Sequence, residues 1–389
     1  MLRLIYLYRN ITRNPLRTLL TCAAVGLPIM IYVLSMAVVD GVNRFLDNSA
    51  KQLRLAVTHK TSMINPLPEG YRRKIESLDP GQTRLLSVCG LRWIGGKIER
   101  DPRPLSTLGA DVDTFLSTFP EYQLTKEEHD AWLRDRQAIV VGSATAGQFG
   151  WKVGDRITIR PSLPPYDPVE FHVISTAPKA QDPLTCWCRR DYMEEKSKEA
   201  GLPLGQVGFF FVKCATQADL DHFRVAIDEL FARSSDETKT QDEKAFMNEF
   251  VTQQFNLPRN LTILSAVTVF VAIMAAANTM SMSFRDRISE IATLKSMGFG
   301  GGFAFTQIQA ESLLLCAIGG LIGALGPYIA FTYTPLKDYQ VPIILYLEIR
   351  PAVCLQAIAI SFGIGLIAAI WPSWAAMRLK VVAAMRSLE

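Results

Sequence analysis

The sequence predicts an α-helical membrane protein with four transmembrane helices and a large extracytoplasmic α+β domain inserted between the first two. Three observations carry this prediction: four long apolar segments, one long polar segment after the first of them, and basic residues grouped on one side of the spans. Apolar residues make up 49% of the 389 residues and are concentrated in these segments. Buried helices of a soluble protein are the weaker alternative, because soluble helices of this length usually carry a polar face.

Windows of about 20 residues, the length that crosses a hydrocarbon core of roughly 30 Å, set the order of the segments. In chain order we expect an amphipathic interfacial helix at residues 1–14, a first span at 15–40, an outer domain with stalk helices at 41–260, a second span at 261–284, a loop at 285–307, a third span at 308–333, a short outer loop at 334–350, a fourth span at 351–372 and a tail at 373–389. The first apolar run is longer than the roughly 7 to 15 residues of a cleavable signal, so we expect it to remain as a span.

Basic residues lie before or at the start of the first span and follow the second and the fourth. They are Arg3, Arg9, Arg13 and Arg17, then Arg285, Arg287 and Lys295, and finally Arg378, Lys380 and Arg386. An excess of Lys and Arg marks cytoplasmic segments, so we expect both termini in the cytoplasm and the large domain on the other side of the membrane. These residues form no contiguous basic face with base-reading groups, which argues against nucleic acid as a partner.

The outer segment predicts a mixed α and β fold. Strands are expected at 138–141, 156–160, 170–176 and 208–214, and helices at 71–78, 126–135, 143–149 and 217–232. A further helix at 242–255 would run almost directly into the second span, and residues 42–53 would prolong the first. Each of these two segments is either a stalk that carries a displacement outward or an ordinary connector.

Four of the seven cysteines lie in the outer segment: Cys89, Cys186, Cys188 and Cys214. An even number permits disulfides without fixing a pairing. A metal site built from Cys186, Cys188 and His172 is a weaker alternative, because the one-residue spacing differs from that of zinc sites. We therefore expect no metal.

Motifs of an enzyme are absent from the sequence. It contains no G-x-x-x-x-G-K-[ST], no H-E-x-x-H and no G-x-S-x-G. We expect neither catalysis nor a cofactor bound by this chain. Ionisable residues deep in a span would mark an ion pathway, but the nearest candidates, Asn278 and Glu311, fit an interhelical hydrogen bond or an interfacial position better.

The loop after the second span predicts a short amphipathic helix. Ile288, Ile291, Leu294 and Met297 recur at three-residue steps, with Arg287, Glu290 and Lys295 beside them and Gly298 as a stop. A helix of this kind lies on a membrane surface or docks into a groove of another protein.

The third span carries Gly319, Gly323 and Gly326. The spacing of the first two is one that lets two helices approach closely in lipid. We expect these glycines to form a transmembrane dimer contact, with a bend in the helix as the alternative.

These segments resemble the FtsX-like and MacB-like permeases of ABC systems, also called type VII or mechanotransmission transporters. The pattern R-x-x-E-I-A-T-L-K-S-M-G-F at 287–299 resembles the coupling segment of the family, and Gln309 and Glu311 precede a Gly-rich span as they do there. The tail is similar from Pro372 to Arg386, although Met385 stands where Leu is usual, and residues 139–155 resemble the family's segment ending L-G-x-x-x-G-D.

The resemblance implies a permease of a bacterial inner membrane, with its large domain periplasmic or extracellular. It would form a homodimer or heterodimer and bind a dimer of a cytoplasmic ATPase, which would hold ATP and Mg²⁺. The coupling residues would be Arg285, Arg287, Ile288, Glu290, Ile291, Leu294, Lys295, Met297 and Gly298. Some family members carry a fused ATPase before the first span. This chain begins near its first span, so it is more similar to members with a separate ATPase.

Two functions are compatible with this resemblance. The first is export or extraction of a lipoprotein, lipid, peptide or amphiphile, in some members with a periplasmic adaptor. The alternative is a transmembrane signalling module that regulates a periplasmic partner without transport. An apolar cleft in the outer domain would favour the first function, and a flat charged surface the second. A receptor without an ATPase is a third interpretation, against which the coupling-like loop argues.

Overall fold

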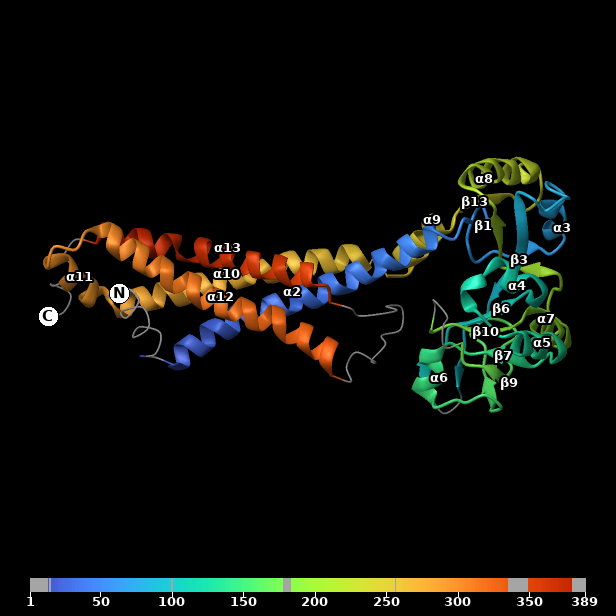
Figure 1. The fold of residues 1–389 in the computed structure, drawn as a ribbon, viewed down its shortest axis with the longest axis horizontal. Helices are drawn as coiled ribbons and strands as arrows, with labels where there is room; N and C mark the ends of the chain where they lie inside the picture. The colour runs from blue at the N-terminus through green and yellow to red at the C-terminus, as the bar shows by residue number, and fades with distance from the viewer. Residues whose placement is uncertain are drawn as a thin grey trace. The chain divides into compact units, whose positions relative to one another are not determined.

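A computed structural model describes residue 13 and residues 15–98, 101–177, 183–255, 257–334 and 349–379. The chain forms two compact units (Figure 1). The helical unit comprises Met1–Asn43 and Phe255–Glu389, and the outer unit comprises Arg44–Gln254. The expected interfacial helix at 1–14, the outer loop at 334–350 and the tail at 373–389 lie largely outside the described residues.

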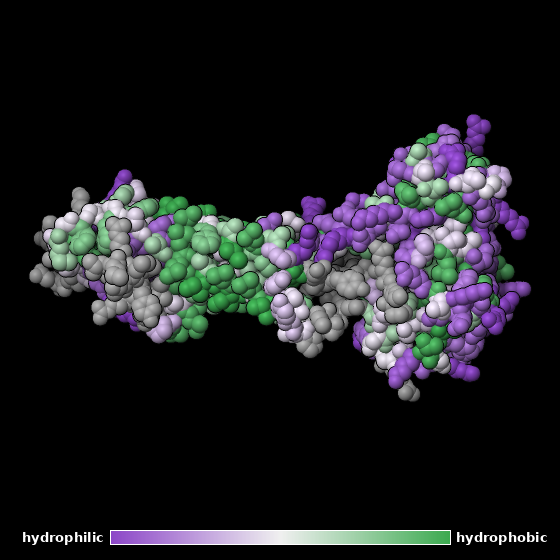
Figure 2. All heavy atoms as spheres, in the orientation of Figure 1, coloured by the Kyte–Doolittle hydropathy of each residue, from purple (hydrophilic) through white to green (hydrophobic). Residues whose placement is uncertain are grey.

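The helical unit is built from apolar helices. They are α2 (Pro15–Ala50), which continues into the outer unit, α10 (Leu257–Asp286), the short α11 (Ile288–Ser296), α12 (Gly301–Tyr333) and α13 (Pro351–Arg378). Within the described ranges, the four long ones are long and apolar enough to cross a membrane. Their hydrophobic surface forms a band over the middle of the unit on the face shown in Figure 2. The predicted set of four spans is confirmed.

Small residues line the interior of this unit. Ala272 and Ala276 of α10, Ala324 of α12 and Ala357 of α13 are fully buried beside Ile29 of α2. Small side chains let helix backbones approach closely, which is how helices gain packing contacts in lipid.

The outer unit contains a nine-stranded sheet in the order β13-β1-β12-β3-β6-β10-β7-β9-β8. The strands are β1 (Arg54–His59), β3 (Leu85–Trp93), β6 (Thr107–Ala110), β7 (Ala138–Val140), β8 (Arg156–Ile159), β9 (Val169–Ser175), β10 (Cys186–Arg189), β12 (Phe209–Cys214) and β13 (Thr238–Asp242). The pairs β6–β10 and β7–β9 are parallel and the other pairs antiparallel. Two small ribbons pair β2 (Leu67–Pro68) with β11 (Gln206–Val207) and β4 (Lys97–Ile98) with β5 (Asp101–Pro104).

Helices connect and cover these strands. They are α3 (Tyr71–Glu76), α4 (Val112–Thr118), the 3-10 helix η1 (Pro120–Tyr122), α5 (Lys126–Arg134), α6 (Ser143–Phe149), α7 (Arg190–Glu199), α8 (Gln217–Phe231) and α9 (Glu243–Phe255). All strands and helices predicted for this segment are present within three residues of their expected ends. The prediction of an α+β outer domain is therefore confirmed.

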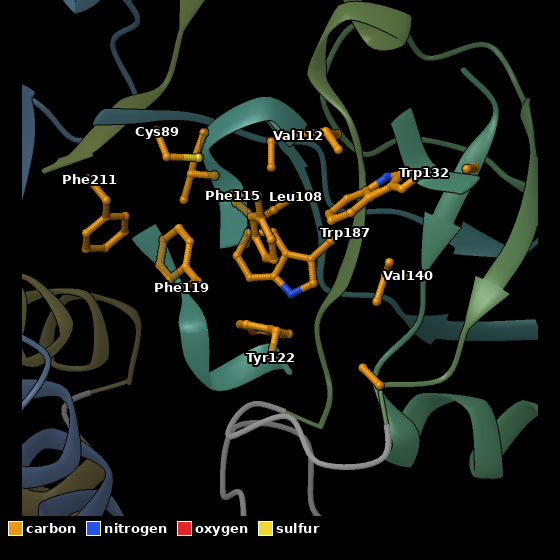
Figure 3. Close-up of a cluster of buried hydrophobic side chains, with 14 of the residues drawn as sticks. Cys89, Leu108, Val112, Phe115, Phe119, Tyr122, Trp132, Val140, Trp187 and Phe211 are labelled. Atoms are coloured by element: carbon orange, nitrogen blue, oxygen red, sulfur yellow. The ribbon is translucent and has the colours of Figure 1, made fainter. Parts of the chain in front are cut away.

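An aromatic cluster forms one core of the outer unit (Figure 3). Phe115 of α4 is fully buried at its centre, and its ring centroid lies 4.9 to 5.2 Å from those of Phe119, Tyr122, Trp132 and Trp187. Such tilted and edge-on contacts add to the hydrophobic stabilisation. Along β12, Phe211 faces this cluster while Phe210 faces a second core under α8, because successive strand residues point to opposite faces.

Candidate functional site

The predicted loop helix is present as α11. Arg287 precedes it as the N-cap, and it ends at Ser296. Gly298 follows with a φ of +94°, a conformation that L side chains rarely adopt, so this glycine turns the chain toward α12. Both the helix and its glycine stop are therefore confirmed.

Arg287 forms a buried ion pair. Its Nη1 lies 2.7 Å from Oε2 of Glu311 on α12, and the two side chains are only 10% and 7% exposed. Removing one partner of a buried pair is costly, because it leaves the other charge without compensation. The pair fixes the junction of α10 and α11 to α12. Glu311 therefore makes an interhelical contact, as expected, and the side chain of Arg287 points into the helical unit.

Lys295 and Glu290 attach α11 to other parts of the helical unit. Lys295 Nζ donates to the carbonyl oxygens of Met377 and Leu379 at 2.9 and 3.0 Å. A cation is favourable there, at the C-terminal end of α13. Glu290 pairs with Arg13 at 2.5 Å. Arg287, Glu290 and Lys295 of the predicted coupling segment are thus used within the chain, whereas Arg285 is exposed in the last turn of α10.

The apolar stripe of α11 is divided between the interior and the surface. Ile291 is buried against Ala304 of α12 and Ala376 of α13, while Ile288 and Leu294 are half-buried. Met297 and Phe299 are 63% and 45% exposed. We call Met297, Gly298 and Phe299 the α11 tip. Among the described residues the first part of the stripe covers the chain's own helices and the tip offers apolar surface, so contact of the stripe with a membrane surface or a partner protein stays a prediction.

A small cleft lies behind the tip, between α10, α11 and α12. Leu294, Phe299 and Phe303 contribute apolar walls, and the cavity volume of ≈ 30 Å³ is enough to hold a water molecule. Gln307 lines it with an amide nitrogen that is buried and has no hydrogen-bond partner in the part of the chain that the structure describes.

The three glycines of α12 likewise differ in whether they face the interior of the chain or its surface. A Cβ added at Gly319 would lie 2.7 Å from the carbonyl oxygen of Cys22, and one at Gly323 would clash with that of Gly26. Both glycines therefore admit α2 of the same chain, which corrects their expected place at a dimer seam. Gly326 is exposed and a Cβ there would meet nothing within 4 Å, so its role in a dimer stays a prediction.

Arg54 organises the root of the outer unit, where α2 ends and α9 begins. Its Nε and Nη2 donate to Glu243, the first residue of α9, at 2.6 and 2.9 Å. Its Nη1 donates to the carbonyl of Thr118 at 3.0 Å and lies 2.7 Å from Glu121. Burial alone would lower the pKa of Arg54, but the two carboxylates outweigh it and raise the pKa.

The same guanidinium lies 4.5 Å over the ring of Phe119, at the edge of the aromatic cluster. Close by, Lys244 of α9 pairs with Asp47 of α2 at 2.7 Å. The ends of the two expected stalk segments are therefore joined to each other and to α4 and η1.

The outer cysteines are free and buried, so none forms a disulfide. Cys186 and Cys188 point to the same side of β10, into a hydrophobic core. His172 lies 2.8 Å from Asp135 instead. Among the described residues no group of His, Cys, Asp and Glu could hold a metal ion.

Several of these features lack a local sequence signal. Pairing of Arg287 with Glu311 joins residues on different helices, and nothing near Arg54 in the sequence marks Glu121 or Glu243 as its partners. The burial of Gln307 also depends on three helices. The polarity of Arg54 at the start of a buried strand is the one signal that indicates a paired charge.

Residues 262–381 match the family model described as FtsX-like permease C-terminal. The macrolide export ATP-binding/permease protein MacB of Syntrophobacter fumaroxidans is 27% identical over 127 residues, which are 32% of this chain and 17% of that protein. This chain therefore spans a small part of that relative.

Two solved structures are similar to the outer part of the chain. The periplasmic region of MacB from Actinobacillus actinomycetemcomitans is 12% identical with a TM-score of 0.35, over 52% of this chain and 94% of that one. The extracellular domain of the ABC-type transporter YknZ from Gram-positive bacteria is 8% identical with a TM-score of 0.33, over 48% and 99%. The family match over residues 262–381, the MacB relative and the four helices able to cross a membrane make this chain similar to FtsX-like and MacB-like ABC permeases.

Proposed function

We propose that this chain is the permease subunit of an ABC export or extraction system, and that a separate cytoplasmic ATPase docks on the α11 tip. The observation that carries the proposal is the contrast between α11, which is attached to the chain's own helices, and the exposed apolar tip that follows it. ATP and Mg²⁺ would be held by the ATPase subunit.

The attachments of α11 support a role in transmitting force. Arg287, Lys295 and Ile291 fix α11 to α12 and α13, so a push on the tip would move α11 together with these helices. A tip on a loosely held loop would absorb the same displacement. Glu290 and Leu294, which we expected to contact the ATPase, act in this proposal through the position of α11.

The end of α13 supports a cytoplasmic location for the tip. Trp371 and Trp374 are exposed there, and Arg378 lies 4.0 Å over the ring of Trp374. Tryptophans concentrate at membrane–water interfaces and basic residues on the cytoplasmic side. Lys295 donates to the carbonyls of Met377 and Leu379 at this end of α13. Because of this contact, α11 would lie at the same cytoplasmic interface.

At the other end, displacement would reach the outer unit through α2 and α9. Arg54 and the pair of Lys244 with Asp47 join these helices to the sheet and to α4. The outer unit would then act on a lipoprotein, lipid, peptide or amphiphile held outside the membrane.

One observation favours the second candidate, a signalling module without transport. An open groove beside α8 and β13, of ≈ 530 Å³, is lined mainly by polar and charged side chains, among them Lys60, Arg224, Asp228, Glu229 and Glu237. A charged surface of this kind suits a protein partner better than an apolar substrate. The two candidates share the ATPase and differ in what the outer unit contacts.

Co-purification from native membranes in mild detergent tests the proposal. The double variant Met297→Ser/Phe299→Ser removes the apolar surface of the tip, and Ile64→Ser/Val153→Ser, at exposed apolar residues of the outer unit, is the matched control. We expect an ABC ATPase to accompany the wild type and the control but not the tip variant. Equal recovery with all three, or with none, would overturn the proposed docking site.

A further inference from the structure

The C-terminal part of α13 carries two exposed tryptophans and an arginine. Trp371 and Trp374 are 69% and 37% exposed, and their ring centroids lie 5.8 Å apart. The guanidinium carbon of Arg378 lies 4.0 Å from the centroid of the Trp374 ring, so a cation–π contact holds this charge beside the indole. We call Trp371, Trp374 and Arg378 the α13 end group.

The α13 end group would lie at the depth of the lipid headgroups. Because α13 has 28 residues, it is roughly 42 Å long, whereas the hydrocarbon core of a bilayer is roughly 30 Å thick. Trp374 and Arg378 lie beyond residue 372, the expected end of the span. At this depth a guanidinium and an indole N–H, both hydrogen-bond donors, can reach the phosphate oxygens of lipids.

The end group also lies in a segment without negative charge. The sequence contains no Asp or Glu from residue 351 to residue 388, and among the described residues no ion pair joins Arg378 to a carboxylate of another helix. Lys295 of α11 adds a second cation, because its Nζ binds the carbonyl oxygens of Met377 and Leu379. This end of α13 therefore has an excess of positive charge, which attracts an anion.

An apolar stripe leads from the end group into the span. Ile367 and Ile370 are 53% and 55% exposed, and each lies four residues before one of the two tryptophans, so they share a side of the helix with them. A soluble anion would use only the cation and leave this stripe uncovered. A phospholipid fits both parts, because its headgroup carries a phosphate and its acyl chains are apolar.

We propose that the α13 end group binds the headgroup of an anionic phospholipid, whose acyl chain lies along Ile367 and Ile370. Arg378 would pair with the phosphate, since a guanidinium fork matches its oxygens. A zwitterionic lipid should bind less well, because its own ammonium group is repelled by the excess positive charge. The inference goes beyond the docking of an ATPase and does not depend on it.

Quenching of tryptophan fluorescence in nanodiscs tests the site. Trp371 and Trp374 belong to the helical unit and the other four tryptophans to the outer unit, so bromine on acyl chains should reach only the α13 pair. Mixed bilayers of phosphatidylglycerol and phosphatidylcholine carry bromine on one lipid or the other in turn. We expect stronger quenching by brominated phosphatidylglycerol, equivalent to a local enrichment of roughly fivefold for one basic residue.

Two arginine variants show whether the end group causes this enrichment. Arg378→Gln should remove most of it, and Arg285→Gln, at an exposed basic residue in the last turn of α10, is the matched control and should keep it. Trp371→Phe/Trp374→Phe measures any quenching in the outer unit, which is subtracted. Equal quenching of the wild type by the two lipids, or equal loss in the two arginine variants, would overturn the proposal. Absence of quenching by either lipid would also overturn it, because another protein would then cover the stripe.

A second measurement does not depend on fluorescence. In native mass spectrometry of the full chain with added phosphatidylglycerol, Arg378→Gln should raise the dissociation constant of the first bound lipid roughly fivefold. Arg285→Gln should leave this constant unchanged. The same constant for Arg378→Gln and the wild type would contradict the assignment, while ATPase recovery reports separately on the α11 tip.

Discussion

The two ends of the proposed force path both rely on a buried arginine, but they are built differently. Arg287 joins α11 to α12 through Glu311, next to a small cleft and an exposed apolar tip. Arg54 binds two carboxylates, a backbone carbonyl and an aromatic ring within one buried network. A buried ion pair is thus present at both sites. At Arg287 it stands beside surface that is open to a partner, and at Arg54 it fixes several elements to one another.

This difference predicts at which of the two sites a substitution should leave the fold stable. At Arg54 three elements share one guanidinium, so loss of that group should affect the stability of the outer unit. At α11 different residues provide the attachment to the chain's own helices and the exposed contact surface. A substitution should therefore be able to remove one of these two functions and leave the other. The following predictions test this contrast.

The largest effect should come from Arg54→Met, which leaves Glu243 buried without its partner. We expect the free energy of unfolding of the outer unit to fall by about 3 to 5 kcal/mol, measured by denaturant titration of the full chain with tryptophan fluorescence. Arg136→Met is the matched control, because Arg136 and Glu195 form an exposed pair and should contribute about 1 kcal/mol or less. Equal losses in the two variants would contradict the central role of Arg54.

Arg287→Met should loosen α11 while leaving the spans folded. Hydrogen bonds to charged groups contribute about 1.5 to 3 kcal/mol, so exchange of the α11 amides should rise roughly ten- to hundredfold. Hydrogen–deuterium exchange of the full chain measures this rise. The double variant Arg287→Met/Glu311→Leu removes the unpaired carboxylate and should restore part of the protection; unchanged exchange in the single variant would show that the pair does not hold α11.

A smaller effect is expected for Gly323→Ala, because the new methyl group would meet the carbonyl of Gly26 and force α2 and α12 apart. Overpacking of this kind costs about 1 to 3 kcal/mol. The faster labelling of Cys22, which is buried on α2 near this contact, gives a direct readout. Gly326→Ala, where the methyl group meets nothing, should match the wild type; identical labelling in both variants would place the α2 contact elsewhere.

The smallest effect concerns an exposed turn of the outer unit. Asp79 accepts hydrogen bonds from the backbone N–H groups of Leu85, Arg84 and Thr83, which lower its pKa. The unfolded chain therefore binds this proton more readily, so the stabilisation is complete above the unfolded pKa of about 3.9 and is lost as pH falls through the lower folded value. Asp79→Asn should be less stable than the wild type at pH 7 and equal to it in strong acid. A stability difference that does not change with pH would exclude this carboxylate as the source.

Periodicity was enough to predict the long helices, α8 and α11, since each carries an apolar face or an unbroken apolar run. It did not predict β1, β3 or β10. Most residues of these strands are buried, so the alternation that marks a half-exposed strand is missing. β10 was further obscured because Cys186 and Cys188 suggested a site and proved to be core residues.

Within the candidate site, residue types indicated which segment matters but not which way each side chain points. The inward turn of Arg287 depends on Glu311, which lies a full helix away in the sequence. The place of Gly319 and Gly323 against α2 depends on the packing of distant segments. Exposure of Asn278 likewise follows from how α12 and α13 cover α10, which no local pattern records.

Photo-cross-linking from the α11 tip in living cells tests the account most directly. A photoreactive residue replaces Met297 in one variant and, as control, the exposed Val153 of the outer unit in another. The account predicts that position 297 captures an ABC ATPase subunit and that position 153 does not. Capture of lipid alone at position 297, or capture of the same ATPase at both positions, would contradict the assignment of the tip as the docking site.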